Sequence, residues 1–360
     1  MKNKRTALVT GGCGFIGANF IRLATELCPD WRIINLDKLT YAGNLSNLDG
    51  IEESSSYRFV HGDICDRALI DRVFSEEAID TVVHFAAESH VDRSITGPSD
   101  FIQTNIVGTF ILLEAAKSHW PIAKTKNRAN CFLHVSTDEV YGSLPEDNNT
   151  LFTETTAFDP RSPYSASKAS SDHLASAYFH TYGLPVKITN CSNNYGPYQF
   201  PEKLIPLIFN NALSGKDLPV YGDGQNIRDW LYVEDHCRGI LRVIEAGDPG
   251  HRYNIGGNNE KKNIDVVHLV CDLLDTKVGL LPSGKPRRQL VTYVKDRLGH
   301  DRRYAIDASK IESQLNWQPR HRFAEGIDKT VDWYLANQSW VQNIVSGDYR
   351  NYYARMYQKR

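Results

Sequence analysis

The sequence has no excess of charge of either sign and no long apolar run. Its 360 residues include 41 Lys and Arg and 43 Asp and Glu, which gives a formal net charge of −2. This balance excludes a strongly basic nucleic-acid-binding protein. No run of about 18 apolar residues exists, so no membrane span is expected. An apolar content of 41% with many aromatic residues also excludes a disordered chain.

Cysteine pairs with metal-binding or redox spacing are also missing. The 7 cysteines are scattered, and no two of them stand in a CxxC spacing. A disulfide framework and a structural zinc site are therefore not expected. The basic residues near the N-terminus lead into a glycine-rich turn and not into the apolar core of a signal peptide. These absences predict a cytoplasmic protein with no metal site, no membrane contact and no nucleic-acid partner.

The first half of the sequence alternates between short apolar runs and helical patterns. Near-continuous apolar strands are typical of a parallel sheet covered on both faces, and the alternation indicates βαβ units. We therefore predict an α/β fold, a Rossmann-like doubly wound parallel sheet. The expected strands are Thr6–Thr10, Arg32–Leu36, Tyr57–His61, Thr81–Phe85, Cys131–Ser136 and Val186–Asn190, and the expected helices are Gly14–Leu27, Arg67–Glu77, Asn105–Ser118 and Tyr164–Tyr182.

The alternation decays after residue 190, where prolines and glycines interrupt the chain. A length of 360 residues fits two domains at about 150 residues each. We predict a dinucleotide-binding domain over residues 1–190, to which some later segments return. A smaller mixed α/β substrate-binding lobe would occupy mainly 191–345, with a helix over Ile327–Gln342, and a C-terminal tail would follow over 346–360.

A glycine-rich turn follows the first expected strand. Residues 10–17 read TGGCGFIG, with Gly11, Gly14 and Gly17 spaced for a tight turn, close approach of a pyrophosphate and helix–strand packing. The N-terminus of the next helix would face the phosphates. Asp37 ends the second strand, where a carboxylate accepts hydrogen bonds from a ribose diol and repels a 2′-phosphate. This pattern favours NAD over NADP, although a strand-end cap would also explain Asp37.

The third strand ends near Asp63. This residue suits a contact with the adenine edge and equally suits an ordinary helix N-cap.

Tyr164 and Lys168 form a YxxxK pair on an expected helix, where residues four apart share one face. A neighbouring ammonium lowers a tyrosine pKa from about 10 toward the working range, which suits a base for a substrate hydroxyl. Thr137, Asp138 and Glu139 follow the fifth strand and should lie at the ligand-binding edge of the sheet. If one carboxyl group stays protonated, the pair can serve as acid and base. A helix-start cap is the alternative.

Other polar residues carry weaker signals. The segment FAAESHVDRS lacks the spacing of a metal site, and His84 within the apolar strand TVVHF fits a hydrogen-bonded core histidine. Arg228 suits bidentate pyrophosphate recognition. The basic run Lys285–Arg288 fits a solvated surface.

Several segments together resemble one family. TGGCGFIG, AAESHVDRSI, STDEVYG, YSASKASSDHL, NCSNNYGPYQFPEKLIP and RDWLYVEDH are similar to the dTDP-glucose 4,6-dehydratase family of extended short-chain dehydrogenases/reductases, over about residues 6–345. The Asp138–Glu139 pair is the most specific element. Similar 4-epimerases lack it, and decarboxylases and some other dehydratases tend to carry Ser at position 138.

The resemblance implies conversion of dTDP-glucose to dTDP-4-keto-6-deoxyglucose and water. Tyr164, helped by Lys168 and Thr137, would take the proton of the glucose 4-OH as hydride passes from C4 to NAD⁺. Glu139 would take the C5 proton, and Asp138 would protonate the departing 6-OH. The hydride would then return to C6, so NAD would stay bound and be regenerated.

The resemblance also implies two sets of binding residues. The NAD site would comprise Gly11, Gly14, Phe15, Ile16, Gly17, Asp37, Lys38, Leu39, Thr40, Asp63, Ile64, Phe85, Ala86, Ala87, Glu88, Ser89, Thr104, Tyr164, Lys168 and Asn194. The substrate site would comprise Ser89, Thr137, Asn193, Lys203, Leu204, Pro219, Val220, Tyr221, Arg228, Asn263, Asp296, Arg297, Leu298, Gly299 and His300.

Two positions depart from the family pattern. Cys13 stands where a small residue such as Ala is usual, and Leu298 stands where Pro is usual. Thymine and uracil differ by one methyl group, worth about 1 kcal/mol, so the sequence leaves the base open. The alternatives are a UDP-sugar 4,6-dehydratase, a 4-epimerase or an inactive NAD-binding module. By the same resemblance, Asn105–Ser118 and Tyr164–Tyr182 would form a four-helix interface in a homodimer.

Overall fold

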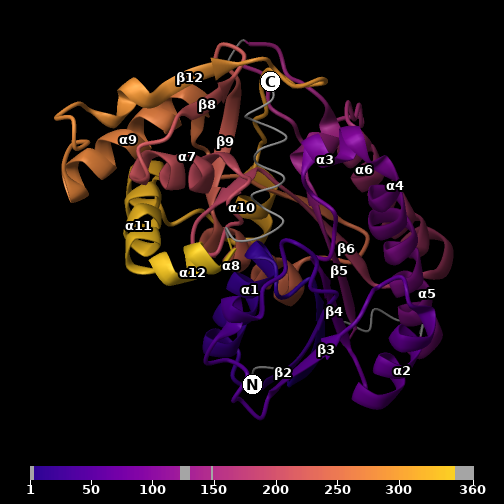
Figure 1. Ribbon diagram of the computed structural model, residues 1–360. Helices are drawn as coiled ribbons and strands as arrows, with labels where there is room; N and C mark the ends of the chain where they lie inside the picture. Colours follow the sequence, from indigo (N-terminus) through magenta and orange to yellow (C-terminus); the bar gives the residue numbers. More distant parts are fainter. Residues whose placement is uncertain (1–3, 122–129, 147–148, 345–360) are drawn as a thin grey trace.

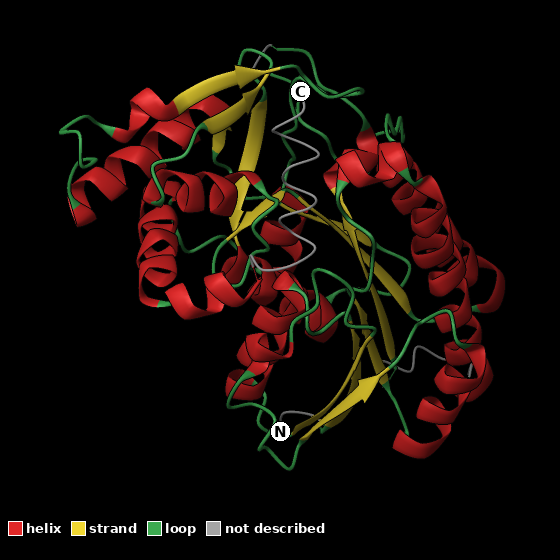
Figure 2. Cartoon of the chain, in the orientation of Figure 1, coloured by secondary structure: helices red, strands yellow, loops and turns green. Residues whose placement is uncertain are grey.

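The structure is a computed structural model that describes residues 4–121, 130–146 and 149–344, so the predicted C-terminal tail (346–360) lies outside the described residues. Its centre is a seven-stranded sheet (Figures 1 and 2). The strands are β1 (Arg5–Thr10), β2 (Trp31–Asp37), β3 (Tyr57–His61), β4 (Thr81–His84), β5 (Cys131–Thr137), β6 (Val186–Cys191) and β10 (Arg252–Ile255).

The seven strands are all parallel and run in the order β10-β6-β5-β4-β1-β2-β3. The order reverses between β1 and β4, and ligands of open parallel sheets bind beyond the carboxyl ends of the strands at such a point. The predicted Rossmann-like fold class is therefore confirmed, and the expected strands agree with the observed ones to within one residue at each end.

Helices cover both faces of this sheet (Figure 1). Alternate side chains of a strand point to opposite faces, so Ala7 and Val9 belong to one core and Leu8 belongs to the other. Two cores on either side explain why the strands read as continuous apolar runs. The first core lies under α1 (Phe15–Leu27), α8 (Val233–Ala246) and α10 (Ser309–Leu315), and the second lies under α2 (Arg67–Glu77), α5 (Thr109–His119) and α6 (Pro163–Tyr182).

Local signals fix both ends of α6. Ser162 caps its N-terminus in a reciprocal arrangement with Ser165, and Pro163 occupies the first turn, where its missing N–H costs nothing. Gly183 follows the last turn with φ of +72°, a left-handed conformation that suits glycine. The helix therefore begins at a defined residue and presents Tyr164 and Lys168 from its first two turns.

Two expected helices differ from the structure. Asn105–Ser118 is not one regular helix, because Ile102–Gly108 forms a π-helical segment between α4 (Pro98–Phe101) and α5. The expected helix Ile327–Gln342 divides at Asn337 into α11 (Phe323–Ala336) and α12 (Gln338–Ile344). Apolar spacing alone does not distinguish a wide helical turn, or a break, from a continuous helix.

The second lobe combines two small sheets with helices around a separate core. The strands are β7 (Asn193–Tyr195), β9 (Ile227–Tyr232) and β11 (Glu260–Lys262) in one sheet, and β8 (Leu218–Tyr221) and β12 (Val291–Val294) in the other. The packed helices are α7 (Leu204–Leu213), α9 (Asn263–Val278), α11 and α12. The remaining short elements are α3 (Val91–Thr96) and the turns Leu45–Leu48, Asp138–Tyr141 and Arg287–Leu290.

β10 follows the first part of this lobe and joins the main sheet beside β6. This agrees with later segments returning to the first domain, while the domain boundaries themselves stay a prediction. None of the helices in the described part of the chain combines the length and apolarity that a membrane crossing needs.

Candidate active site

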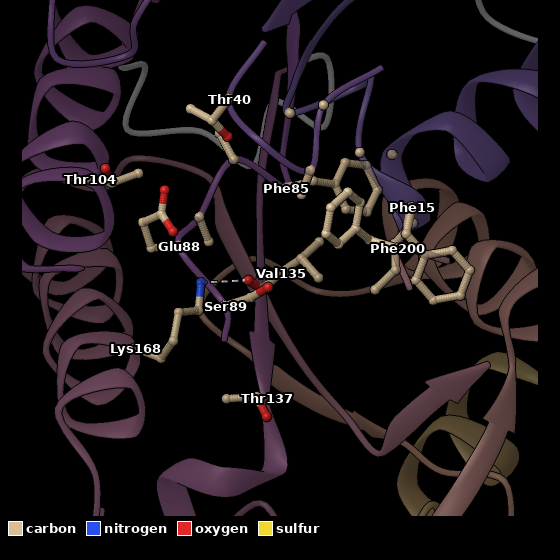
Figure 3. A pocket seen from close by; sticks show the side chains of 18 of the residues that line it. Phe15, Thr40, Phe85, Glu88, Ser89, Thr104, Val135, Thr137, Lys168 and Phe200 are labelled. Carbon is tan, nitrogen blue, oxygen red and sulfur yellow. Dashed lines mark hydrogen bonds between the residues drawn. The ribbon is translucent and has the colours of Figure 1, made fainter. Parts of the chain in front are cut away.

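A cavity of about 510 Å³ opens at the carboxyl edge of the main sheet. Its lining residues follow the ends of β1 to β6 and include the loop 199–203 of the second lobe. Figure 3 shows Phe15, Phe85 and Phe200 among its walls and Thr104 on the flanking helix. All five predicted catalytic residues line the cavity, as do all predicted cofactor residues except Leu39.

The glycine turn leaves space only where the pattern predicts it. A Cβ atom on Gly11 would lie 2.6 Å from the Ala86 backbone nitrogen, and one on Gly17 would lie 2.2 Å from the Gly11 oxygen. At Gly14 the nearest atom would be the Gly11 oxygen at 3.3 Å, and this residue faces the cavity as the N-cap of α1 without a side-chain cap. The turn thus fits a pyrophosphate against the helix N-terminus.

Asp37 lies at the cavity wall and also stabilises the loop. Its Oδ2 accepts a hydrogen bond from the Cys13 N–H at 2.9 Å, and its Oδ1 accepts one from the Leu39 N–H at 2.8 Å. Burial raises the pKa of Asp37, and these N–H donors oppose the rise. Leu39, whose φ is +55°, therefore shapes the loop through its backbone and does not line the cavity. The capping and binding interpretations of Asp37 are compatible.

Asp63 is not the N-cap of α2. Asp66 is the cap, because its side chain accepts from the Leu69 N–H, whereas Asp63 pairs with Lys38 at 2.8 Å and accepts from the Cys65 N–H. The Asp63–Lys38 pair holds two cavity-lining loops together. The glycine turn, Asp37 and these loops together fit a dinucleotide such as NAD.

Lys168 is directed into the sheet. Its Nζ donates to the Val135 carbonyl at 2.8 Å (Figure 3). Burial lowers the pKa of Lys168 to about 8, and the charge of Asp172 opposes this. Tyr164 is also buried, and burial together with the charge of Glu139 raises its pKa well above 10. The predicted lowering of this pKa is therefore wrong for the protein's own groups, because burial and nearby carboxylates outweigh the ammonium.

Asp138 and Glu139 lie in different surroundings. Asp138 is 2% exposed, and its pKa is raised well above its usual range by burial, then by the charges of Glu139 and Asp229. Burial also raises the pKa of Glu139, but here the charges of Arg297, Lys203 and Arg228 oppose the rise. Environments that separate two carboxyl pKa values assign one group as acid and the other as base.

The second lobe supplies part of the predicted substrate site. Asn193, Asn194 and Lys203 line the cavity, and the Lys203 Nζ donates to the Ser89 carbonyl at 3.0 Å. The remaining predicted residues lie outside the cavity lining; they are Leu204, Pro219, Val220, Tyr221, Arg228, Asn263, Asp296, Arg297, Leu298, Gly299 and His300. The Val220 side chain belongs to the core of the second lobe.

Arg228 is buried instead of standing free in a loop. Its guanidinium donates to the carbonyls of Ile227 and Asp301 at 2.7 and 2.9 Å and stacks over Tyr304 at 4.2 Å. Its charge, like those of Arg297 and Lys203, acts on Glu139. These cations therefore extend the electrostatic environment of the cavity toward the second lobe. Leu298, which departs from the family pattern, is 74% exposed.

Several cavity residues were not anticipated from the sequence. Gln199, Phe200 and Glu202 precede Lys203 in the same loop, so adjacency to a basic residue was an available signal. Asp100 and Gln103 approach through α4 and the π-helical segment, a geometry without a sequence signal.

Comparisons with known proteins agree with this site. The family model for GDP-mannose 4,6 dehydratase matches residues 8–330. The chain is 57% identical to the dTDP-glucose 4,6-dehydratase of Shigella flexneri, over 98% of this chain and 99% of that protein. The solved dTDP-glucose 4,6-dehydratase of Streptomyces venezuelae with NAD bound is 46% identical, with a TM-score of 0.85 and coverage of 94% and 99%.

A more distant likeness reaches another activity. The solved UDP-glucose 4-epimerase of Thermotoga maritima is 28% identical, with a TM-score of 0.79 over 92% of this chain and 99% of that one. The family match and the near-complete coverage of relatives show that the chain belongs to the GDP-mannose 4,6-dehydratase family, among its dTDP-glucose 4,6-dehydratases.

Proposed function

We propose that this protein converts dTDP-glucose to dTDP-4-keto-6-deoxyglucose and water, with NAD as a resident cofactor. The observation that carries the proposal is the buried Asp138–Glu139 pair beside Tyr164 and Lys168 in one cavity. Near-full-length relatives are dTDP-glucose 4,6-dehydratases, and a solved relative holds NAD.

NAD, held by the glycine turn and Asp37, would supply the hydride acceptor for the sugar C4 and the hydride donor for C6. Tyr164 takes the proton of the 4-OH, and its phenol oxygen is positioned by a hydrogen bond with the Thr137 side chain. The Lys168 ammonium, anchored on the Val135 carbonyl, supplies positive charge that stabilises Tyr164 as the phenolate, the form that can accept this proton.

Asp138 and Glu139 divide the elimination. Glu139, facing Arg297, Lys203 and Arg228, is the anionic base that takes the C5 proton, which the 4-keto group makes acidic. Asp138 stays protonated and gives its proton to the departing 6-OH. After water leaves, Glu139 holds the proton that returns to C5 as hydride is delivered to C6.

A 4-epimerase is not favoured. Epimerisation at C4 requires no proton transfer at C5 or to the 6-OH, so it gives no role to two buried carboxyl groups with separated pKa values. The relative with that activity is 28% identical, against 57% for the dehydratase of Shigella flexneri.

Purified protein mixed with dTDP-glucose and no added nicotinamide tests the proposal, with the product followed by NMR. Formation of the 4-keto-6-deoxy sugar supports the activity, bound NAD and internal hydride return together. Turnover of UDP-glucose alone would keep the chemistry and overturn the base assignment. No turnover of either sugar by NAD-loaded protein would overturn the dehydratase.

We also propose that the protein forms a homodimer and lies in the cytoplasm. Ile102, Phe110 and Tyr182 are exposed on the π-helical segment, α5 and α6, which supports a four-helix interface with a second copy. Light scattering that shows a monomer at micromolar concentration would contradict this, and Phe110→Glu should dissociate a dimer.

All seven cysteines are free, which is in keeping with a reducing compartment.

A further inference from the structure

The segment that follows Ser89 has no role in the reaction described above. His90 is the N-cap residue of α3, and the next three residues form its first turn. Asp92 and Arg93 are consecutive, yet their side chains contact different parts of the molecule. We refer to residues 90–93 as the clasp.

Asp92 contacts the substrate-side loops. Its Oδ2 accepts a hydrogen bond from the Tyr221 hydroxyl at 2.8 Å, and its Oδ1 lies 4.0 Å from the Arg297 guanidinium. Tyr221 ends β8, and Arg297 follows β12. Arg297 Nε and Asp92 Oδ1 are both buried without a hydrogen-bond partner within the described residues. A guanidinium whose Nε–H is buried and unused suits a phosphate oxygen.

Arg93 contacts the cofactor-side loops. Its guanidinium stacks 3.7 Å above the Tyr41 ring, and its Nε lies 3.1 Å from Glu202 Oε2. Tyr41 also hydrogen bonds with Glu202 and packs edge-on against Phe200, with ring centroids 5.5 Å apart. Tyr41 lies within the loop that lines the cavity through Lys38, Thr40, Ala42 and Gly43, and Phe200 and Glu202 line the facing loop.

We propose that the clasp positions both ligands through its two neighbouring side chains. Asp92 orients Tyr221 and Arg297 toward the diphosphate of the nucleotide sugar. Arg93 joins the Tyr41 loop to the 199–203 loop and so retains the dinucleotide. Both are positioning residues, and the inference rests on the proposed function.

Two variants of the holoenzyme should each weaken the binding of one ligand and leave the other ligand's binding unchanged. Asp92→Asn should raise the Kd for dTDP and the KM for dTDP-glucose by about tenfold or more, because a charged partner is lost, with kcat little changed. Its half-time for NAD loss during dialysis should stay as in the parent. Arg93→Met should shorten that half-time by about tenfold. Its KM for dTDP-glucose, measured while NAD is saturating, should change by less than about twofold.

Matched variants separate positioning from general damage. Glu77, the last residue of α2, has a similarly buried carboxylate that pairs with Arg32 and Arg58. Glu77→Gln should change neither the Kd for dTDP nor the half-time for NAD loss. Tyr41→Leu keeps Arg93 and should still release NAD faster. In a double-mutant cycle, Tyr221→Phe should add little to Asp92→Asn if the two residues act through one contact.

The proposed function and the clasp can fail separately. A parent protein that neither binds dTDP nor converts dTDP-glucose would overturn the proposed function. A parent protein that does both, with Asp92→Asn and Arg93→Met each changing both readouts equally or neither, would overturn the clasp and leave the function intact.

Discussion

Asp138 and Glu139 are neighbours in the chain, but different charges surround their carboxyl groups. The charges of Glu139 and Asp229 add to the effect of burial on Asp138 and outrank Arg228, whereas Arg297, Lys203 and Arg228 oppose the effect of burial on Glu139. Both groups leave water, so burial raises both pKa values, and the neighbouring charges then decide which group keeps its proton. At the residue scale, the surrounding side chains therefore determine which carboxyl group can act as the acid and which as the base.

Single substitutions should separate these two roles. Asp138→Asn and Glu139→Gln should each slow keto-sugar formation by about 100- to 10,000-fold. In D₂O, Asp138→Asn should still exchange the C5 proton of the sugar, whereas Glu139→Gln should not. NMR of recovered substrate measures this exchange. Loss of C5 exchange in Asp138→Asn, with exchange kept in Glu139→Gln, would reverse the assignment.

The pH dependence should report Lys168. With a pKa of about 8, its ammonium is present at lower pH and is lost as the pH rises through 8, so kcat should fall on the alkaline side. Asp172 opposes the lowering of this pKa; its Oδ2 accepts a hydrogen bond from the Asn190 amide at 3.1 Å, and its Oδ1 lies 3.2 Å from His134 Nε2.

Asp172→Asn should therefore move the alkaline limb to lower pH. Cys191 and His134 also face this region, so Cys191→Ser serves as a control that should move the limb less. An alkaline limb at the same pH in Asp172→Asn and in the parent would show that the charge of Asp172 does not govern Lys168.

At the scale of elements, the turn between β1 and α1 requires glycine for two separate reasons. Gly17 must lack a side chain because the backbone of Gly11 occupies that space, whereas Gly14 must lack one because the cavity lies there. The same residue type thus serves packing at one position and ligand approach at the other.

Two alanine variants should distinguish these requirements. Gly17→Ala should lower the free energy of unfolding by about 1–3 kcal/mol, since the added Cβ overpacks the turn. Gly14→Ala should lower that free energy by less than Gly17→Ala, about 0.5–1 kcal/mol, because Ala is a poorer N-cap of α1, yet it should reduce NAD binding. Urea unfolding of NAD-free protein and NAD content after purification measure the two effects. Equal stability of both variants would contradict the steric assignment.

The elements that the sequence predicts are those with local signals. β1 to β6, α1, α2 and α6 have apolar runs, caps and glycines that act over a few residues, so their bounds agree with the structure. The π-helical segment and the break at Asn337 arise from packing between distant residues, and no short-range pattern encodes them. Arg287 shows the same limit, because it is buried against Asp275 instead of solvated.

The candidate site divides in the same way. The predicted catalytic residues and nearly all predicted NAD-side residues line one cavity, because most of them follow strand ends directly in the chain and Tyr164 and Lys168 lie at the start of α6. Gln199, Phe200 and Glu202 reach the cavity only through the docking of the second lobe, and Arg228 turns inward onto carbonyls of a distant loop.

At the scale of the molecule, the second lobe is fastened to the first by side chains far apart in sequence. Trp340 on α12 donates its Nε1–H to Asn47 Oδ1 at 2.8 Å, and Arg22 of α1 lies 5.1 Å from the Tyr198 ring. Both contacts join the second lobe to the α1 side of the first, and Tyr198 immediately precedes the cavity-lining loop 199–203.

Replacing Trp340 should test this connection. Trp340→Phe leaves the buried Asn47 oxygen without its donor, which should lower the free energy of unfolding by about 1–3 kcal/mol. Chemical denaturation measures the loss, and Asn47→Ala combined with Trp340→Phe should cost less than the sum of the single variants. Strict additivity would show that the hydrogen bond contributes little.

The cavity is lined by residues of the main sheet and by loop 199–203 of the second lobe, so a ligand that fills it contacts both parts. A tightly bound dinucleotide then acts on folding by mass action, since it binds only when both walls are formed. Calorimetry of the NAD-loaded protein should show one cooperative transition, and removal of NAD should lower its midpoint and separate the melting of the lobes. The bound cofactor would then act as part of the packed interior that joins the two lobes.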